Sequence, residues 1–494
     1  MAKSRQVGGM QEVFIQASGK SLASVERVIK AVEKLGGRVI HVYPPTMMVA
    51  SVPSARVGQL KKQAGIVAAE TGPFSARSLK AAGHELQSAL VAWNDHISAE
   101  RRERTLASPE LGKSWGEGQQ RLPPDPPPDI VAQLRRREAE LAPGGAERAL
   151  AGAPVMSLPV LVGRIAVGVV WVDSTVAGLA IADTEKSKTL SETTEGLNLL
   201  ATFEPRANIQ WFYDFKRPRL SLTVAQAGNE DLWRNAAMAA MGYSADLAGM
   251  NKYLSDIKAA NNANWSYAVF ITKYPKSWFA YYWGNHVVMD FGVDGWGIDN
   301  FSIVFAHETG HVFGCGDEYA SSGCTCTSLH GRYQVANGNC ENCASPFIPC
   351  LMAHNTAALC DYSRGQLGWN ELAVQSKGST VLKGTWTFDF DTGVQGPAGG
   401  ADIWWEQVNS VVRYLVPQSG AMLAHMGKPD FDAVSYQTLK GLSYTATPIV
   451  GSNNSTNKLK AGTVVAIKTN AGRYAKMKIN SYGYNLNITW VTYK

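Results

Sequence analysis

The sequence places two histidines and a glutamate where they could hold and use a metal ion. His307 and His311 are four residues apart in a stretch with helical character that we expect to begin at Asp299 or Asn300. Side chains four residues apart leave one face of a helix, so both imidazoles can reach one ion. Zinc accepts imidazole nitrogens at two corners of its tetrahedron. Glu308, next to the first histidine, is placed to take a proton from a metal-activated water and return it to a leaving amine.

The residues after His311 extend this pattern. Gly314 allows a sharp turn out of the helix, because glycine adopts backbone angles that other residues resist, and Asp317 follows three residues later. The whole reads HExxHxxGxxD and resembles the signature of the metzincin zinc metalloproteases, most of which have His at the last position. The resemblance implies that Asp317 is the third metal ligand, and its neighbour Glu318 is the alternative.

The resemblance also implies roles for two residues further along. Met352 lies where metzincins carry the methionine of a turn beneath the zinc, although a buried Met is more often core filler. Some metzincins have a Tyr two residues after that Met, which steadies the tetrahedral intermediate. His354 holds this position here, so it is a candidate catalytic residue, either as a fifth ligand or as a donor to the oxyanion. The alternative is a histidine that merely belongs to the turn.

All seven cysteines lie between Cys315 and Cys360. One interpretation is a second, structural zinc held by two closely spaced pairs, Cys324 with Cys326 and Cys340 with Cys343. The other is three disulfides among the six cysteines from 324 onward, which would brace a loop-rich segment. We favour disulfides, with Cys350–Cys360 as the most expected pair and Cys315 as a buried thiol.

The elements that must position these residues suggest a multidomain chain. Residues 1–75 predict the order βαββαβ of an α+β ferredoxin-like unit, with a helix over 22–35 capped by Ser21. The stretch from Lys34 to Glu70 also resembles the propeptides of subtilisin-type proteases, which chaperone and inhibit their own enzyme. The alternative is a plain ferredoxin-like module with another partner.

Residues 76–155 are rich in Pro and charge, with the run LPPDPPPD at 122–129, and predict an exposed, partly helical linker. Residues 156–375 alternate strands and helices, as an α/β metzincin-like catalytic domain would. The resemblance implies an edge strand near 281–290 that pairs with an extended substrate. Residues 376–494 are short strands with Gly and Asn turns and predict an all-β sandwich or jelly roll.

Composition narrows the function classes. The 494 residues carry 47 Lys and Arg against 41 Asp and Glu, a net charge of +6, without a dense basic tract. We therefore expect no nucleic-acid partner. The N-terminus lacks the apolar core of a standard signal peptide, and the run 158–172 is too interrupted to span a bilayer. The cysteine cluster nonetheless favours an exported or extracellular protein, and we expect a monomer.

These patterns predict a zinc-dependent endopeptidase that is made as a latent precursor, with a protein or peptide as substrate. No Cys precedes Cys315, so a thiol of the leader cannot block the zinc, and carboxylates, histidines or steric occlusion are the alternatives. The acids and aromatics at 388–393 and 401–406 suit a Ca²⁺ site, or a carbohydrate or surface ligand, in the C-terminal region; buried core aromatics are the alternative there. Two other functions stay open: a binding or adhesion protein on a protease scaffold, and a zinc amidase.

Overall fold

The computed structural model describes residues 6–494 except 8, 45, 76–83, 107, 117–157, 224–229, 277, 294, 398, 430, 432, 433 and 435. The chain forms two compact units. The first holds the described residues of Met1–Gly145, Leu161–Cys326 and Gly338–Cys360, and is mixed α/β. The second holds those of Ala146–Val160, Thr327–Asn337 and Asp361–Lys494, and is mainly antiparallel sheet. The expected combination of an α/β part with a β-rich C-terminal part is confirmed at this level.

The N-terminal strands follow the predicted order closely. Strand β2 pairs with β5 on one side and with β4 on the other, β4 pairs with β3, and every pair is antiparallel. Helix α1 turns its apolar stripe onto this sheet, and the Ser21 side chain caps its first turn by accepting from the Ser24 N–H at 3.3 Å. The bounds are β1 (Gln6–Val7), β2 (Met10–Ala17), α1 (Leu22–Lys34), β3 (Arg38–Tyr43), β4 (Met47–Pro53), α2 (Val57–Leu60) and β5 (Ile66–Glu70).

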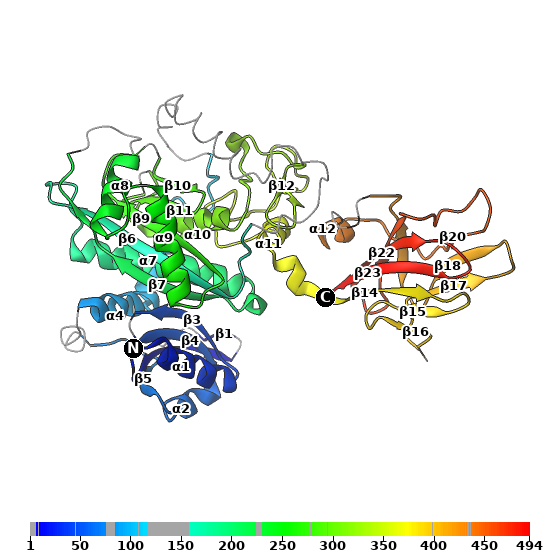
Figure 1. The fold of residues 1–494 in the computed structure, drawn as a ribbon, viewed down its shortest axis with the longest axis horizontal. Helices are drawn as coiled ribbons and strands as arrows, with labels where there is room; N and C mark the ends of the chain where they lie inside the picture. Colours follow the sequence, from blue (N-terminus) through cyan, green and yellow to red (C-terminus); the bar gives the residue numbers. More distant parts are fainter. Residues whose placement is uncertain are drawn as a thin grey trace. The chain divides into compact units, whose positions relative to one another are not determined.

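These strands do not end in a sheet of their own. Strand β3 pairs in parallel with β7, so one eleven-stranded sheet runs through the first unit. Its main path is β1–β2–β4–β3–β7–β6–β9–β11–β10, and the last pair is an antiparallel hairpin with β10 at the end (Figure 1). The added strands are β6 (Arg164–Ser174), β7 (Gln210–Lys216), β8 (Arg219–Leu220), β9 (Trp265–Thr272), β10 (Ala280–Trp283) and β11 (His286–Asp290). This continuity was not evident from the sequence.

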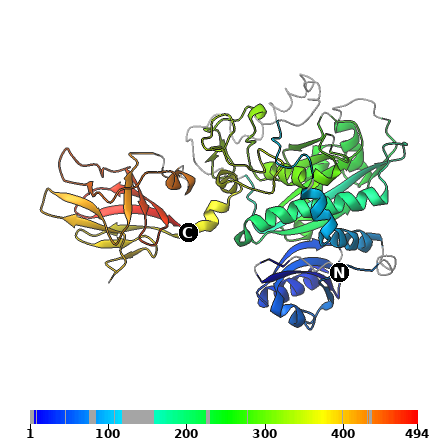
Figure 2. The ribbon, with the colours of Figure 1, turned by 180° about the vertical axis from the view of Figure 1, so that it is seen from behind.

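Helices cover both faces of the sheet. Helix α9 (Leu247–Ala260) lies in front of it in Figure 1. Its buried side chains share one core with those of α8 (Glu230–Ala240). Figure 2, from behind, shows α7 (Asp183–Phe203) and α4 (His84–His96) on the opposite face. There the indoles of Trp171 and Trp211 donate to Thr189 and Leu197 of α7.

Helix α10 (Phe301–Val312), which carries the HExxH pattern, packs against α7. A glycine makes this close crossing possible. A Cβ at Gly196 would lie 2.4 Å from the carbonyl oxygen of Ser302, so any side chain there would force the two helices apart. The crossing holds α10 against α7, and nearly every residue of α10 is buried.

The described part of the expected linker is folded, which corrects the prediction of an exposed segment. In the region of helices α4 and α5 (Ala99–Leu106), Trp93 and Ile97 are buried, each 1% exposed. Residues 108–116 also belong to the first unit. The apolar spacing of α4 is diluted by polar residues, so its buried face was not evident from the sequence. The Pro-rich run at 122–129 lies outside the described residues.

A cluster of buried charges joins the N-terminal strands to α7. The two ring nitrogens of His96 lie 2.9 Å from Glu12 of β2 and 2.7 Å from Glu195 of α7. Burial acts to lower the pKa of His96, but these two carboxylates outweigh it and raise the pKa to about 10. Nearby, Arg101 of α5 pairs with the buried carboxylate of Glu192 at 2.7 Å. The N-terminal strands are therefore held by charge as well as by sheet hydrogen bonds.

The second unit contains two five-stranded antiparallel sheets whose buried side chains share one core. Their orders are β14–β23–β22–β21–β19 and β16–β15–β17–β18–β20. The bounds are β14 (Val374–Leu382), β15 (Thr387–Asp389), β16 (Val394–Gln395), β17 (Ile403–Gln407), β18 (Arg413–Pro417), β19 (Met422–His425), β20 (Ile449–Val450), β21 (Val464–Lys468), β22 (Tyr474–Ser481) and β23 (Leu486–Tyr493). Short elements complete the described chain: β12 (Leu329–His330), β13 (Val335–Ala336), α11 (Asp361–Gln366) and α12 (Tyr436–Lys440).

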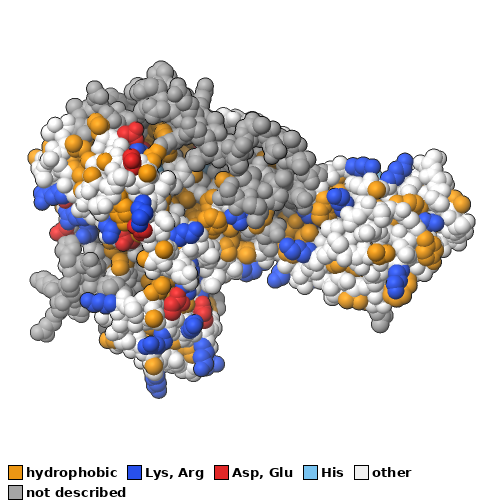
Figure 3. Space-filling model, in the orientation of Figure 1, with side chains coloured by type: hydrophobic (Ala, Val, Ile, Leu, Met, Phe, Trp, Pro, Cys, Tyr) orange, Lys and Arg blue, Asp and Glu red, His pale blue; other side chains and the backbone are white. Residues whose placement is uncertain are grey.

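Two surface features bear on partners. Among the helices that the structure describes, none combines the length and the apolar character needed to cross a bilayer. On the face drawn in Figure 3, the basic side chains that are coloured lie scattered among acidic, apolar and uncharged surface.

The His96 cluster predicts a pH-dependent stability. Its contribution is fully present below the ordinary histidine pKa of ~6.5 and is lost as the pH rises through about 10, because the folded state binds the proton more tightly. Replacing His96 by Ala should lower the free energy of unfolding by ~3–5 kcal/mol at pH 6, since the buried Glu12 and the partly buried Glu195 lose their partner. The loss should shrink toward pH 10. Thermal unfolding from pH 6 to 10 measures it, with His425→Ala as the control; a deficit independent of pH contradicts the assignment.

Candidate metal centre

The chain leaves α10 through a tight turn that brings a carboxylate back to the helix. Gly314 has φ +91°, a left-handed conformation that favours glycine, and the Cys315 N–H donates to the Gly310 carbonyl at 3.0 Å. Asp317 follows this turn. The sequence prediction that Gly314 permits the turn agrees with this backbone.

Two backbone carbonyls orient the histidines. Nδ1 of His307 lies 3.0 Å from the Leu351 oxygen, and Nδ1 of His311 lies 2.9 Å from the Cys315 oxygen. A carbonyl oxygen can only accept, so both Nδ1 atoms carry a proton, and Nε2 is the atom through which each ring, when neutral, can bind a metal. The two Nε2 atoms lie 3.0 Å apart. This arrangement suits two imidazoles that share one cation.

Asp317 completes the group. Its Oδ1 lies 3.2 Å from His307 Nε2 and 3.1 Å from His311 Nε2. Ligand atoms ~2.0–2.2 Å from a tetrahedral zinc lie ~3.3–3.6 Å from one another, so the three atoms, at 3.0–3.2 Å, need to separate only slightly to hold the ion. Glu318 instead faces Asn339 and Cys360. Of the two carboxylates that the sequence offered, Asp317 is the one beside the histidines.

The electrostatics of the group favour a held cation. Burial acts to lower the pKa of His311, but the Asp317 carboxylate outweighs it and raises the pKa to about 9. Burial acts to raise the pKa of Asp317, but the two histidines outweigh it and hold the pKa well below its ordinary value. A partly buried anion and two imidazoles thus stabilise positive charge at one point.

Glu308 lies beside this point and is nearly fully buried. Burial raises the pKa of its carboxyl above the ordinary value, while the two histidines and a hydrogen bond from the Tyr282 N–H act against the rise. Tyr282 belongs to the terminal strand β10, and its ring stacks on His311 with centroids 6.3 Å apart. Glu308 is therefore fixed between the metal-binding group and the end of the sheet.

Met352 lies directly beneath α10. A Cβ at Gly310 would lie 2.8 Å from the Met352 sulfur, so the missing side chain at Gly310 makes room for it. Met352 is fully buried, and its carbonyl accepts from the Glu318 N–H at 2.9 Å. The methionine thus links the turn after α10 to the turn that carries Leu351.

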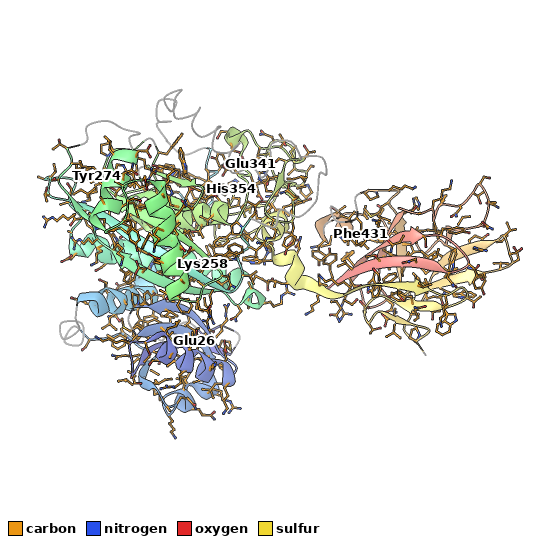
Figure 4. The ribbon with its side chains drawn as sticks, in the orientation of Figure 1. Glu26, Lys258, Tyr274, Glu341, His354 and Phe431 are labelled. Atoms are coloured by element: carbon orange, nitrogen blue, oxygen red, sulfur yellow. A yellow bond between two sulfur atoms is a disulfide. The ribbon has the colours of Figure 1, made fainter. Side chains whose placement is uncertain are left out.

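The structure does not bring His354 to this group. Its Nε2 lies 3.1 Å from Glu341 Oε1, and the two side chains are labelled side by side in Figure 4. The ring also packs against Phe347 at 5.2 Å between centroids. The backbone explains the difference, because His354 pairs in a β-bridge with Ser114, whose hydroxyl contacts the same Glu341. His354 is a residue of the turn in this structure.

Sequence reasoning missed the segment that forms this bridge. We call residues 108–116 the strap. Its Trp115 indole donates to the Leu351 oxygen at 2.7 Å and lies against His307, with ring centroids 5.2 Å apart. Main-chain bonds join Gly112 and Trp115 of the strap to the chain after Met352. No local pattern could indicate a contact across almost 200 residues of chain.

The cysteines resolve into two disulfides and three thiols. Cys324 pairs with Cys340 and Cys326 with Cys343, whereas Cys315, Cys350 and Cys360 are buried thiols. The prediction of a Cys350–Cys360 disulfide is therefore wrong in this structure, and so is the alternative of a zinc held by the four paired cysteines. The reason is that the Cys360 sulfur faces Glu318 Oε1 at 3.0 Å.

One group in the second unit also suits a cation. Carboxylate oxygens of Asp389, Asp391 and Asp402 lie within 4.8 Å of one another. Burial raises the pKa of Asp402 to about 6, with the other two carboxylates adding to the rise. Acids of the two stretches chosen from the sequence, 388–393 and 401–406, are thus brought together.

Comparison with known proteins adds no family to this description. No protein-family model matches the chain, and no curated protein matches it.

The geometry predicts that metal binding depends on Asp317. Asp317→Ala should weaken zinc binding by more than the ~10–100-fold that loss of an outer-shell partner costs, because a direct ligand is removed. Asp299→Ala, in the short turn just before the same helix, is the matched control. Competition with a chelator of known affinity measures the change. Equal zinc affinity in the two variants contradicts the role of Asp317.

Proposed function

We propose that this protein is a zinc-dependent endopeptidase of the type that its HExxHxxGxxD pattern resembles, the metzincins. The observation that carries the proposal is the meeting of His307 Nε2, His311 Nε2 and Asp317 Oδ1 within 3.0–3.2 Å of one another. Glu308 stands beside them with a raised pKa. Two imidazoles and one carboxylate are a ligand set that catalytic zinc uses when a further position stays open.

The residues divide the work of peptide hydrolysis. His307, His311 and Asp317 would hold Zn²⁺, which when bound polarises a carbonyl and makes water more acidic. Glu308 accepts the proton of the attacking water and passes it to the departing amine. Burial raises the pKa of its carboxyl above the ordinary value, which is the direction that a general base working near neutral pH requires.

The end of the sheet offers a place for an extended substrate. The expected edge strand near 281–290 is a hairpin, in which β11 lies inside the sheet and β10 ends the described strand order. Strand β10 also supplies the N–H that bonds to Glu308. A peptide that adds to β10 by main-chain hydrogen bonds would lie next to the proposed base.

Loss of Glu308 should abolish cleavage while sparing the metal. Glu308→Ala should bind zinc as the wild type does and cleave peptides at least ~10²-fold more slowly, because a general base typically contributes 10²–10⁴-fold. A peptide library with metal analysis of both proteins measures this. Glu185→Ala, which removes an ion-paired carboxylate from α7, is the control. Cleavage by Glu308→Ala at the wild-type rate contradicts the mechanism. If the wild type cleaves no peptide even after activation, a binding protein is favoured.

The strap gives the proposed latency a physical basis. Its Trp115, which is 6% exposed, covers His307. Main-chain hydrogen bonds also hold the strap to the segment that follows Met352. Its last residue, Gly116, lies against Tyr319, whose pKa is raised by burial and by the nearby Asp317 and Glu308. The N-terminal half therefore reaches the proposed active site without any cysteine, and occlusion is the form of inhibition that we propose.

Weakening the strap should raise activity. Trp115→Ala in the full chain should cleave peptides faster than the wild type, because the indole no longer holds the strap over His307. Trp115→Phe, which keeps a ring but loses the bond to Leu351, should fall between them. Trp386→Ala, an exposed tryptophan of the second unit, is the control. Equal rates with full zinc content in all four proteins contradict an inhibitory strap.

Finer assignments remain part of this proposal. The order β5–β2–β4–β3 supports a ferredoxin-like N-terminal unit, and the two sheets with a shared core support a β-sandwich in the second unit. The Asp389, Asp391 and Asp402 group supports a Ca²⁺ site, and this β-rich unit is where we place a carbohydrate or surface ligand. Two disulfides support an extracellular setting.

A zinc amidase would share the metal site, and cleavage of internal peptide bonds distinguishes the two enzymes.

A further inference from the structure

A second group of metal-binding atoms lies behind the first. One carboxylate oxygen of Glu318 and the sulfurs of Cys350 and Cys360 all lie within 4.8 Å of one another. All three residues are buried, at 0%, 0% and 4% exposed. None of them belongs to the His307, His311 and Asp317 group, and none is used by the proposed reaction.

The carboxylate of this group is oriented by its surroundings. Glu318 Oε2 accepts from the Asn339 side-chain amide at 2.7 Å, and that amide is itself fixed because its oxygen accepts from the Ile348 N–H at 2.9 Å. The other oxygen, Oε1, faces the Cys360 sulfur at 3.0 Å. Outer-shell bonds of this kind hold ligating carboxylates in place at metal sites.

The sulfurs are also placed rather than loosely packed. The Cys350 sulfur accepts from the Cys360 N–H at 3.2 Å. Cys315 is a third buried thiol of this region, and Cys350 and Glu318 are among the groups that act on it electrostatically. A thiol-rich set with one carboxylate is a donor set for zinc, since thiolates favour thiophilic ions over Mg²⁺ or Ca²⁺.

We propose that Glu318, Cys350 and Cys360 bind a second, structural Zn²⁺ ion, with Cys315 as the candidate fourth ligand. The charge of the ion offsets the cost of burying a carboxylate beside thiolates. The site also explains a structural need. It ties the turn after α10, which includes Cys315 and Glu318, to the turn that includes Cys350 and Leu351. Those two turns supply the carbonyl oxygens that orient His311 and His307.

Cobalt substitution tests this site in the full-length chain without any mutation. Co²⁺ bound by a thiolate gives a strong near-ultraviolet charge-transfer band, and Co²⁺ bound by histidine and carboxylate alone does not. The band should appear in the wild type and persist in His307→Ala/His311→Ala, which destroys the first site. It should disappear in Cys350→Ser/Cys360→Ser. Cys324→Ser/Cys340→Ser removes sulfurs from the same loop and should keep the band.

Zinc stoichiometry separates this inference from the proposed function. Two zinc ions per wild-type chain, with one left in His307→Ala/His311→Ala, support both sites. If the wild type holds only one zinc, and that zinc and the cobalt band both persist in His307→Ala/His311→Ala, the second site is supported and the first is contradicted. The inference is overturned if the wild type shows no cobalt–thiolate band. Peptide mapping without reductant that finds Cys350 joined to Cys360 in the metal-loaded protein also overturns it. If Cys350→Ser/Cys360→Ser fails to fold, the band in the other proteins still decides.

Discussion

The candidate site depends on two hydrogen bonds from histidine Nδ1 atoms to backbone carbonyls. The Leu351 and Cys315 oxygens fix both imidazoles in the tautomer that leaves Nε2 open, and they point the two Nε2 atoms at one place. Helix spacing alone puts the histidines on one face, but it leaves ring rotation and protonation undetermined. Gly314 positions the Cys315 carbonyl through its left-handed backbone. The Leu351 carbonyl precedes Met352 beneath α10 and also accepts from the Trp115 indole, so the site joins chain segments that lie far apart in sequence.

The N-terminal half is structurally part of the first unit, which changes how latency should be understood. Strand β3 continues the sheet through β7, and His96 and Arg101 neutralise carboxylates of α7. Removing these groups would leave an open sheet edge. It would also take Arg101 from the buried Glu192, which keeps Lys188, and His96 from the partly buried Glu195. A cut in the chain after the strap would therefore leave the N-terminal half bound. Activation, in this account, requires the strap to move away from His307 and does not require the N-terminal half to leave.

The local features of this structure were predictable, and the long-range ones were not. The Ser21 cap, the stripe of α1, the position of α10 and the Gly314 turn all follow from short patterns that neighbouring residues determine. The β3–β7 pairing, the contact of Trp115 with His307 and the disulfide partners depend on the tertiary fold. His354 illustrates the limit. Its distance from Met352 suggested a role at the metal, but a β-bridge to Ser114 turns its ring toward Glu341. For the third ligand, the spacing of the motif already favoured Asp317 over Glu318, and the structure shows that the two carboxylates face different groups.

The central claim is that His307, His311 and Asp317 hold one zinc ion beside Glu308. Anomalous diffraction at the zinc absorption edge, from crystals of the full-length protein grown with zinc, tests it most directly. The account predicts a peak within ~2.0–2.2 Å of His307 Nε2, His311 Nε2 and Asp317 Oδ1, with the Glu308 carboxylate next to it. A map with no peak at that point, while the two histidines keep their bonds to Leu351 and Cys315, would contradict it.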